Sequence, residues 1–437
     1  MQRLSIKIQE NEFVLHGDGR AVGLRGCSRQ PARLLASGLS LEQLDLVLQG
    51  SPSQTRSLIT QLQTMLERIR LGHEAWLELQ PDDSSDIYQS RLFAGDFNWI
   101  LGSVQPKGIG IRLELQRQDF WQLPWRLLAL SNRHGSDQTD GLQIDNRADN
   151  SGQNWCRVAA AQLLGDLPAP VRIRLRNDLN SLKNLDRIIF GWGSGFTSPL
   201  PALEGEHAES LLNFGAVMDV NCQAGAFGLV QWELPEAIRV LAWVLPGAAF
   251  TGLAGKQLRP VMRLINLTTL HPETWLSWKL YQGSLVFQST AQQISCTREL
   301  QTLPMICLPN LPNREVPWND LRLELIAHNR NSGSFTLSVD AVYLFFTDGW
   351  RQFAALEDGE LAFGHTLIDQ VDQQQPTIYQ SQTQKNQHAY QVLGKGLWLV
   401  PGQEHVLQVL YDAGRSMPLQ MTTRLQLEYQ PRRRMLP

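Results

Sequence analysis

The sequence is short of charged side chains, which make up 19% of its 437 residues, against about 25% in a typical soluble protein. The 39 Lys and Arg residues nearly balance the 42 Asp and Glu residues, giving a net charge of −3. Without a strong basic field the chain lacks the electrostatic basis for non-specific nucleic-acid binding. We therefore expect no nucleic-acid specificity, and a surface formed largely by neutral polar side chains.

Cysteine is scarce, and long apolar runs are absent. The cysteines form no C-x-x-C pair, which argues against a disulfide framework and a thiolate zinc site. We interpret them as reduced thiols, mostly small buried residues: Cys27, Cys156, Cys222, Cys296 and Cys307. No run of about 18 apolar residues occurs, so we expect no membrane span. The opening MQRLSIKIQE alternates polar and apolar residues and does not resemble a secretion signal, which favours folding in a cytoplasm.

The common catalytic motifs are also absent. The sequence has no G-x-S-x-G nucleophile elbow, no H-E-x-x-H pair and no Walker-type phosphate loop. GWGSGF at 191–196 has glycines at the wrong spacing for a dinucleotide fingerprint, and it favours a loop between strands. We therefore expect neither enzymatic activity nor a cofactor.

Two acidic clusters could supply ligand oxygens or catalytic carboxylates. The first, in QPDDSSD, could bind calcium, but a solvated turn explains it better. The second, in LEGEHAES, could form a mixed metal site or a pair of glycosidase carboxylates, but a polar surface loop explains it better. The residues concerned are Asp82, Asp83 and Asp86 in the first cluster, and Glu204, Glu206, His207 and Glu209 in the second.

Tryptophan, by contrast, is plentiful, with 13 residues. Exposed indole rings can stack on sugars, and we consider Trp192, Trp275 and Trp278 as candidates for glycan stacking. Tryptophan beside alternating apolar residues is more often part of a core or a subunit interface. That interpretation is also preferred for Trp121 and Trp125 in FWQLPW.

Alternation of polar and apolar residues is the dominant pattern, and it predicts antiparallel sheets with one buried face. The clearest alternating segments are residues 4–8, 109–115, 171–176, 321–325, 335–339 and 424–429. The chain ends in three successive arginines, Arg432, Arg433 and Arg434. They could clamp a phosphate or carboxylate, although a solvated terminus or an assembly contact is commoner.

One segment follows a helical period instead. Its apolar residues recur every three or four positions and predict a single amphipathic helix over residues 52–71. Ser51 is the expected N-cap, with Pro52 at the first helical position and Gln54 as the capping-box partner. Gly72 is expected to end the helix in a left-handed conformation.

These patterns predict a mainly β protein with several parts. We expect an N-terminal β-barrel-like domain with one packed helix, followed by a connector, a jelly-roll β-sandwich and a C-terminal β-strand region with a Gln-rich insertion. The expected ranges are 1–130, 131–154, 155–350 and 351–437.

Several of these segments resemble distal tail and related baseplate proteins of tailed bacteriophages. The helix SPSQTRSLITQLQTMLERI and the strands EAWLELQ and GIRLELQRQDFW are similar to the amino-terminal domain of that family. NWCRVAAAQLLGDLPAPVRIRLRN and LRLELIAHNRNSGSFTLSVDAVYLFFTDGWRQF resemble the opening and the close of a jelly-roll domain found in some phage tail proteins. The resemblance implies that the helix packs across a β-barrel-like fold.

The resemblance also implies a non-enzymatic structural role in the virion tail, after assembly in the host cytoplasm. Copies of the chain would form a ring, commonly a homohexamer, that continues the tail tube and meets tail tip or hub proteins, while β-sandwiches project outward. An alternative is a glycan-binding module or adhesin that binds cell-surface glycan through Trp192, Trp275 or Trp278. A third, a glycoside hydrolase, would need two carboxylates about 5–10 Å apart.

Overall fold

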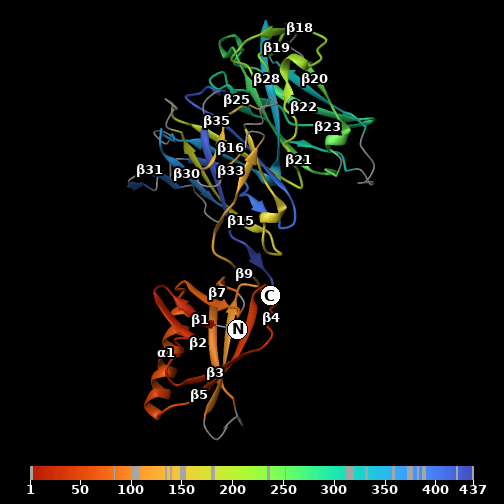
Figure 1. The fold of residues 1–437 in the computed structure, drawn as a ribbon. Helices are drawn as coiled ribbons and strands as arrows, with labels where there is room; N and C mark the ends of the chain where they lie inside the picture. The colour runs from red at the N-terminus through yellow and green to blue at the C-terminus, as the bar shows by residue number, and fades with distance from the viewer. Residues whose placement is uncertain are drawn as a thin grey trace. The chain divides into compact units, whose positions relative to one another are not determined.

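The computed structural model forms two compact units, each described here by itself (Figure 1). Unit 1 consists of Met1–Arg126, Leu164–Ala169 and Gln430–Pro437, and unit 2 of Leu127–Leu163 and Pro170–Tyr429. Both ends of the chain therefore belong to unit 1. The structure describes residues 3–82, 84–100, 108–132, 135–137, 140–147, 154–178, 183–233, 237–250, 252–310, 319–329, 333–356, 360–371, 377–380, 383–385, 390–419 and 422–435.

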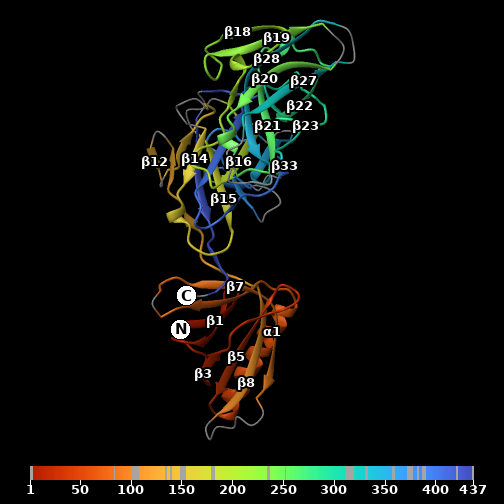
Figure 2. The same cartoon turned by 90° about the vertical axis from the view of Figure 1, so that its right-hand side faces the viewer.

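Unit 1 is built on one sheet, sheet 1, which curls around its core (Figure 2). Its main strand order is β2-β1-β6-β7-β8-β5-β3, with β4 pairing β5, and β9 pairing both β7 and β37. The strands are β1 (Arg3–Ile8), β2 (Asn11–His16), β3 (Leu24–Arg29), β4 (Arg33–Leu34), β5 (Ser40–Leu48), β6 (Ala75–Gln80), β7 (Tyr88–Trp99), β8 (Ile109–Arg117), β9 (Trp121–Gln122) and β37 (Arg432–Arg433).

The predicted helix is confirmed as α1 (Pro52–Arg70), which packs against β7. The side chain of Ser51 accepts from the backbone N–H of Gln54, and the side chain of Gln54 accepts from the backbone N–H of Ser51, so the capping box is complete. Gly72 has a φ of 88°, and the N–H of His73 donates to the carbonyl of Arg68 at 3.1 Å, the bond of a Schellman motif. Leu58, Leu62, Leu66 and Ile69 are buried in the core of unit 1.

Unit 2 contains four sheets, and sheets 2 and 3 each combine strands from both halves of the chain. Sheet 2 comprises β10 (Arg126–Leu127), β13 (Leu142–Ile144), β15 (Ala169–Asn177), β30 (Thr366–Gln370), β31 (Thr377–Gln380), β32 (Thr383–Lys385), β34 (Trp398–Leu399) and β36 (Thr423–Tyr429). Sheet 3 comprises β11 (Leu130–Asn132), β12 (Gly135–Asp137), β14 (Trp155–Val158), β16 (Arg187–Ser194), β29 (Trp350–Ala355), β33 (Tyr390–Gly394) and β35 (His405–Asp412).

Sheets 4 and 5 are formed by one continuous stretch, residues 203–346, inserted between the neighbouring strands β16 and β29 of sheet 3. Sheet 4 comprises β17 (Leu203–Glu204), β18 (Asn213–Met218), β19 (Ala226–Trp232), β21 (Gln257–Leu264), β25 (Leu300–Thr302), β26 (Ile306–Cys307) and β28 (Phe335–Phe346). Sheet 5 comprises β20 (Ile238–Leu245), β22 (Trp275–Gln282), β23 (Leu285–Gln288), β24 (Gln292–Gln293) and β27 (Leu321–His328). Short 3-10 turns lie at η1 (Ala160–Gln162), η2 (Gly205–His207), η3 (Gly247–Phe250), η4 (Leu267–Thr269) and η5 (Thr347–Gly349).

The four sheets of unit 2 pack in series. Sheets 2 and 3 are joined by a buried ion pair in which Arg351 donates to Asp369 at 2.7 Å. Sheets 3 and 4 share an apolar cluster that includes Ile189, Tyr343 and Phe345. Sheets 4 and 5 enclose the largest described core cluster. In Figure 1 the strand labels run accordingly across unit 2, from β30 through β16 and β28 to β20.

The central strands of sheets 3 and 4 are therefore buried on both faces. All eight residues of β35 are buried, as are all residues of β28 except Thr336. Such strands lose the polar alternation of a half-exposed strand. Gly191 of β16 shows how closely the layers approach, because a Cβ atom there would lie 1.6 Å from a ring carbon of Phe345.

The mainly β prediction, with one helix packed on a sheet, is confirmed over the described residues, and each of the six alternating segments lies in a strand. The division of the chain differs from the expected ranges. Residues expected to form a connector contribute β12 and β13. Sheets 2 and 3 each contain strands from both sides of the boundary expected at residue 350. Sequence-local patterns could not show this, because the pairings join segments more than 150 residues apart. The jelly-roll connectivity stays a prediction.

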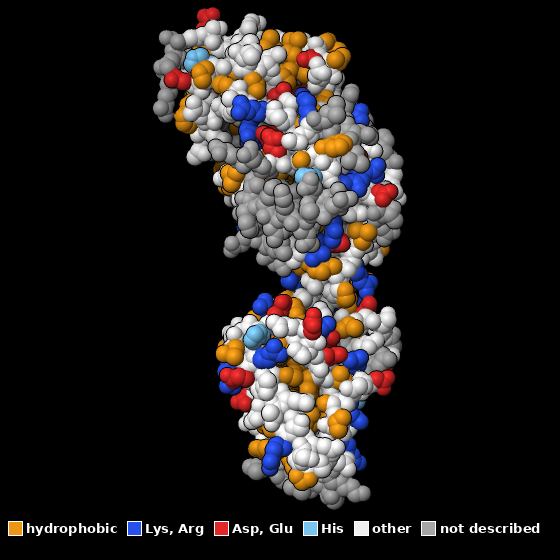
Figure 3. Space-filling model, turned by 90° about the vertical axis from the view of Figure 1, so that its left-hand side faces the viewer, with side chains coloured by type: hydrophobic (Ala, Val, Ile, Leu, Met, Phe, Trp, Pro, Cys, Tyr) orange, Lys and Arg blue, Asp and Glu red, His pale blue; other side chains and the backbone are white. Residues whose placement is uncertain are grey.

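The surface agrees with the low charge of the chain. On the face shown in Figure 3, described neutral surface predominates and charged side chains are scattered among apolar ones. None of the described helices is long and apolar enough to cross a membrane.

Candidate functional site

A cavity of about 890 Å³ lies between sheets 3 and 4 of unit 2, and we call it the large cavity. Strands β16, β29 and β33 line it from sheet 3, β21 and β25 line it from sheet 4, and β24 of sheet 5 contributes two further lining residues. Five of its lining side chains are glutamines: Gln257, Gln292, Gln293, Gln301 and Gln352. Amides both donate and accept hydrogen bonds, so this lining suits a ligand rich in polar groups.

Two of these amides are buried in the wall. Gln301 is fixed through both ends, because its Nε2 donates to the carbonyl of Ser295 and its Oε1 accepts from the N–H of Ser295. Gln352 accepts from the hydroxyl of Thr302 at 2.8 Å. Only 5% of Gln352 is exposed, and no described residue accepts a hydrogen bond from its Nε2. The cavity wall thus holds an amide donor without a described protein partner, which a ligand oxygen can satisfy.

Arg259 on β21 is the most informative charged residue of the large cavity. One guanidinium nitrogen donates to the carbonyl of Leu303 at 3.0 Å, and the guanidinium lies 5.3 Å from the ring centroid of Trp350. No carboxylate of the described residues lies within 4.0 Å of it. Burial lowers the pKa of Arg259, which reflects the cost of holding this cation away from water.

Three more cations line the large cavity. Arg187 donates to the carbonyl of Leu300 at 2.6 Å and lies 4.0 Å from Asp412. Lys256 and Lys395 are exposed, and Lys256 pairs with Asp348 at 2.5 Å. Among the described residues that line the cavity, Asp348 is the sole acidic one. The lining is therefore positive overall.

The tryptophans proposed for glycan stacking lie apart from the large cavity. Trp278 is fully buried in the core between sheets 4 and 5, 6.3 Å from Trp243, so its ring has no open face. Trp192 is buried on β16 and stacks on His405 at 5.3 Å. Trp275 is half-buried at the start of β22. Glycan stacking at these residues stays a prediction, and of the three only Trp275 retains a partly exposed side chain.

The GWGSGF segment differs from the expected loop. Its first four residues belong to β16, and Gly195 then turns the chain with a φ of 80°. Gly191 lies in this buried strand because only a residue without a side chain leaves room there for the ring of Phe345.

The acidic clusters are tied into the fold. Arg126 donates to both oxygens of Asp86 at 2.9 Å, and Asp83 lies outside the described residues. In the second cluster, Glu209 pairs with Arg322 at 3.0 Å, while Glu206 and His207 form part of η2. Across the described ranges, no group of three or more His, Cys, Asp or Glu side chains could hold a metal ion.

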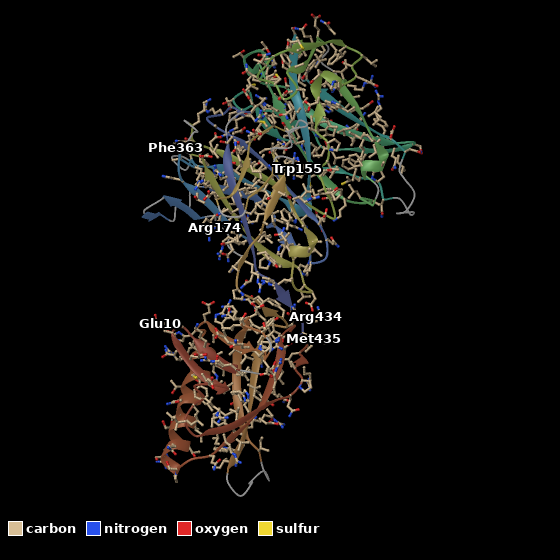
Figure 4. The ribbon with its side chains drawn as sticks, in the orientation of Figure 1. Glu10, Trp155, Arg174, Phe363, Arg434 and Met435 are labelled. Carbon is tan, nitrogen blue, oxygen red and sulfur yellow. The ribbon has the colours of Figure 1, made fainter. Side chains whose placement is uncertain are left out.

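Two of the three terminal arginines, Arg432 and Arg433, form β37 of sheet 1, whereas the sequence favoured a solvated terminus or an assembly contact. Arg432 and Arg433 pair with Gln122 and Trp121, and the guanidinium of Arg432 lies 4.3 Å from the ring centroid of Phe120. The N–H of Arg434 donates to Asp166 at 2.9 Å. Arg434 and Met435 are labelled in unit 1 in Figure 4.

Sequence reasoning missed an apolar surface in unit 1, formed by Phe97, Trp99 and Ile109, which we call the Trp99 patch. Phe97 and Trp99 stack edge to face at 6.4 Å. Trp99 pairs with Ile111, so Ile109 lies diagonally across from it on the same face of the sheet. Trp99 is 53% exposed and Ile109 46%. The alternation of these strands predicts burial, and only the structure shows that their ends extend past the core.

No family model and no curated protein matches the chain. Among solved structures, it is similar to the Dit protein (gp 19.1) of SPP1, a paradigm of the hub adsorption apparatus in phages that infect Gram-positive hosts, at 11% identity over 78% of this chain and 99% of that one, with a TM-score of 0.24. It is also similar to a chain of the phage P2 baseplate in its activated conformation with Ca, at 9% identity over 99% and 98%, with a TM-score of 0.25. A structure of the infectious bursal disease virus Gt strain matches at 9% identity over 81% of both chains, with a TM-score of 0.19.

Proposed function

We propose that the chain is a non-enzymatic structural component of a phage tail tip or baseplate. Copies join through unit 1 into a ring that connects the tail tube to tip proteins, with the sandwich sheets projecting outward. The resemblance of residues 51–121 to the amino-terminal domain of distal tail proteins supports this role. The capped helix α1 and its packing on β7 agree with that resemblance.

The Trp99 patch is the observation that carries the proposal. Large apolar side chains that are half exposed and adjacent mark protein interaction sites more often than free surface. Aromatic residues are enriched at the centres of such interfaces, where charged residues are depleted. Trp99 and Ile109 fit this pattern, since they lie side by side on one face of β7 and β8.

A ring also requires that each copy use two different surfaces, because a rotational repeat joins one face of a subunit to another face of the next. The Trp99 patch supplies one of the two. Interfaces that hold stable oligomers bury about 800 Å² or more on each partner. We therefore expect the patch to be the apolar centre of a wider contact with neutral polar margins.

The test is the oligomeric state of the full chain, measured by light scattering and negative-stain microscopy. We expect the wild type to form closed rings, and Trp99→Glu to reduce the assembly to monomers, because a charge at an apolar interface centre is desolvated without a partner. Val244→Glu is the matched control, since Val244 is 52% exposed on β20 of unit 2 and lies outside the patch. A wild-type chain that stays monomeric at high concentration and is absent from purified particles contradicts the proposal.

A further inference from the structure

We propose that the large cavity binds an anionic, polyhydroxylated ligand, namely an oligosaccharide or polyol chain that carries carboxylate or phosphate groups. The inference goes beyond the structural role. All of its described lining residues belong to unit 2 of one copy, so binding is not expected to depend on ring formation.

The first argument is the charge of Arg259. A half-buried cation without a counter-ion costs free energy, because burial removes its water shell. The wall gives this guanidinium a carbonyl and an indole face, but no described carboxylate. An anionic group in the cavity would supply the missing counter-charge, and a guanidinium binds carboxylate and phosphate oxygens through two parallel hydrogen bonds.

The second argument is where this cation lies. Arg259 donates to Leu303, and Gln352 accepts from Thr302, the preceding residue. The cation and the unpartnered amide donor of Gln352 are thus anchored to consecutive residues of one wall. Both offer hydrogen-bond donors, which calls for a ligand rich in acceptor oxygens.

The third argument is the remaining lining. Gln257, Gln292 and Gln293 are exposed amides. The side chains of Gln292 and Gln293 each donate one bond to a backbone carbonyl, which leaves their oxygens and their second N–H groups for hydroxyl groups of a ligand. Lys395 adds an exposed cation that attracts anions toward the opening. The volume of about 890 Å³ falls within the range of about 300–1,000 Å³ for small-ligand sites. A short oligomer, bound through both its charges and its hydroxyl groups, fits this lining.

Isothermal titration calorimetry of the full chain tests the proposal with three oligomers of similar length. Oligogalacturonate carries carboxylates, a glycerol-phosphate oligomer carries phosphates, and a maltooligosaccharide is neutral. We expect at least one anionic oligomer to bind about tenfold or more tightly than the neutral one, with affinity that falls as salt is added. Binding of one anionic oligomer alone identifies the recognised group. Absence of binding by both, or equal binding of the neutral oligomer, overturns the proposal.

Variants locate the site. Arg259→Gln should weaken binding about tenfold or more, whereas Arg157→Gln, at an exposed cation outside the cavity, should leave it unchanged. Lys395→Gln should cause a smaller loss of about two- to fivefold. Circular dichroism checks the folding of each variant. If Arg259→Gln does not fold, Lys395→Gln decides the matter, because Lys395 is exposed, and wild-type affinity in that variant then overturns the proposal.

Discussion

The guanidinium of Arg117 lies over the indole ring of Trp121, with its central carbon 4.5 Å from the ring centroid. Its Nε donates to Glu42 at 2.8 Å, and Arg29 binds the same carboxylate while lying 5.2 Å from the same ring. The cluster joins strands β3, β5, β8 and β9. Glu42 is fully buried, so the two cations replace the water that its charge has lost.

Glu42→Gln should destabilise unit 1 by about 3–5 kcal/mol, because it leaves two arginines near Trp121 without their shared counter-charge. Hydrogen exchange measured on peptides of β5 and β8 would report this loss separately from unit 2. Glu12→Gln is the control, since Glu12 pairs with Arg3 on the exposed surface and should cost about 1 kcal/mol or less. Equal losses in the two variants would refute the structural role of the cluster.

Deletion of residues 430–437 should destabilise unit 1, because it removes β37 from the sheet. Trp121 and Gln122 then lose β37, so that only Gln122 keeps a strand partner, Gln89 of β7. The N–H of Leu123 also loses the carbonyl of Pro431, to which it donates at 2.9 Å. We expect faster hydrogen exchange in β9 and a lower melting temperature of unit 1, with unit 2 unchanged. Met435→Ser, at an exposed position of the same tail, should have no effect. Unaltered exchange in β9 after the deletion would contradict this prediction.

The free energy of unfolding of unit 2 should fall as pH rises, because of the carboxyl group of Asp412. Burial raises the pKa of this carboxyl well above its ordinary value, and no described group donates a hydrogen bond to either oxygen. The folded state therefore holds a proton that the unfolded state loses at lower pH. That contribution to stability is complete below the ordinary carboxyl pKa and disappears as pH rises through the raised pKa.

Asp412→Asn removes this ionisation, so the stability of the variant relative to wild type should increase as pH rises above the ordinary carboxyl pKa of about 4. Urea denaturation at several pH values measures the difference. Asp348→Asn serves as the control, because Asp348 is exposed and paired with Lys256. A difference between variant and wild type that stays constant with pH would exclude the ionisation of Asp412 as its cause.

Gly191→Ala should separate sheets 3 and 4, because the new Cβ atom would overlap the ring of Phe345. Overpacking of this kind costs about 1–3 kcal/mol, and occasionally more. Gly215→Ala on β18 meets no atom within 4 Å and should change stability by about 0.5 kcal/mol or less. Thermal unfolding of the two variants provides the comparison, and similar melting temperatures would argue against close packing at Gly191.

The sequence predicted the local structure well. The helix needed only Ser51, Gln54 and Gly72, whose roles depend on neighbours within four residues. The half-exposed strands were visible because their apolar residues face one side. β35 and residues 341–346 of β28 gave a weaker signal, because they are buried on both faces and lose alternation.

The candidate site had no signal in the sequence. Arg259, Gln352 and Lys395 are far apart along the chain, and none belongs to a recognisable motif. Their meeting depends on the packing of sheet 3 against sheet 4. The tryptophans became candidates because an exposed indole ring can stack on a sugar. Residue type alone does not show whether a tryptophan is exposed, and Trp278 and Trp192 are buried.

Unit 1 draws strands from residues 3–8 and 432–433, and this imposes an order on biosynthesis. A ribosome releases the first strands early, yet sheet 1 gains β37 only after the whole of unit 2 has been translated. During that interval Trp121 lacks a strand that later pairs with it. A nascent chain interrupted before residue 430 would lack β37 and would therefore carry an incomplete sheet 1.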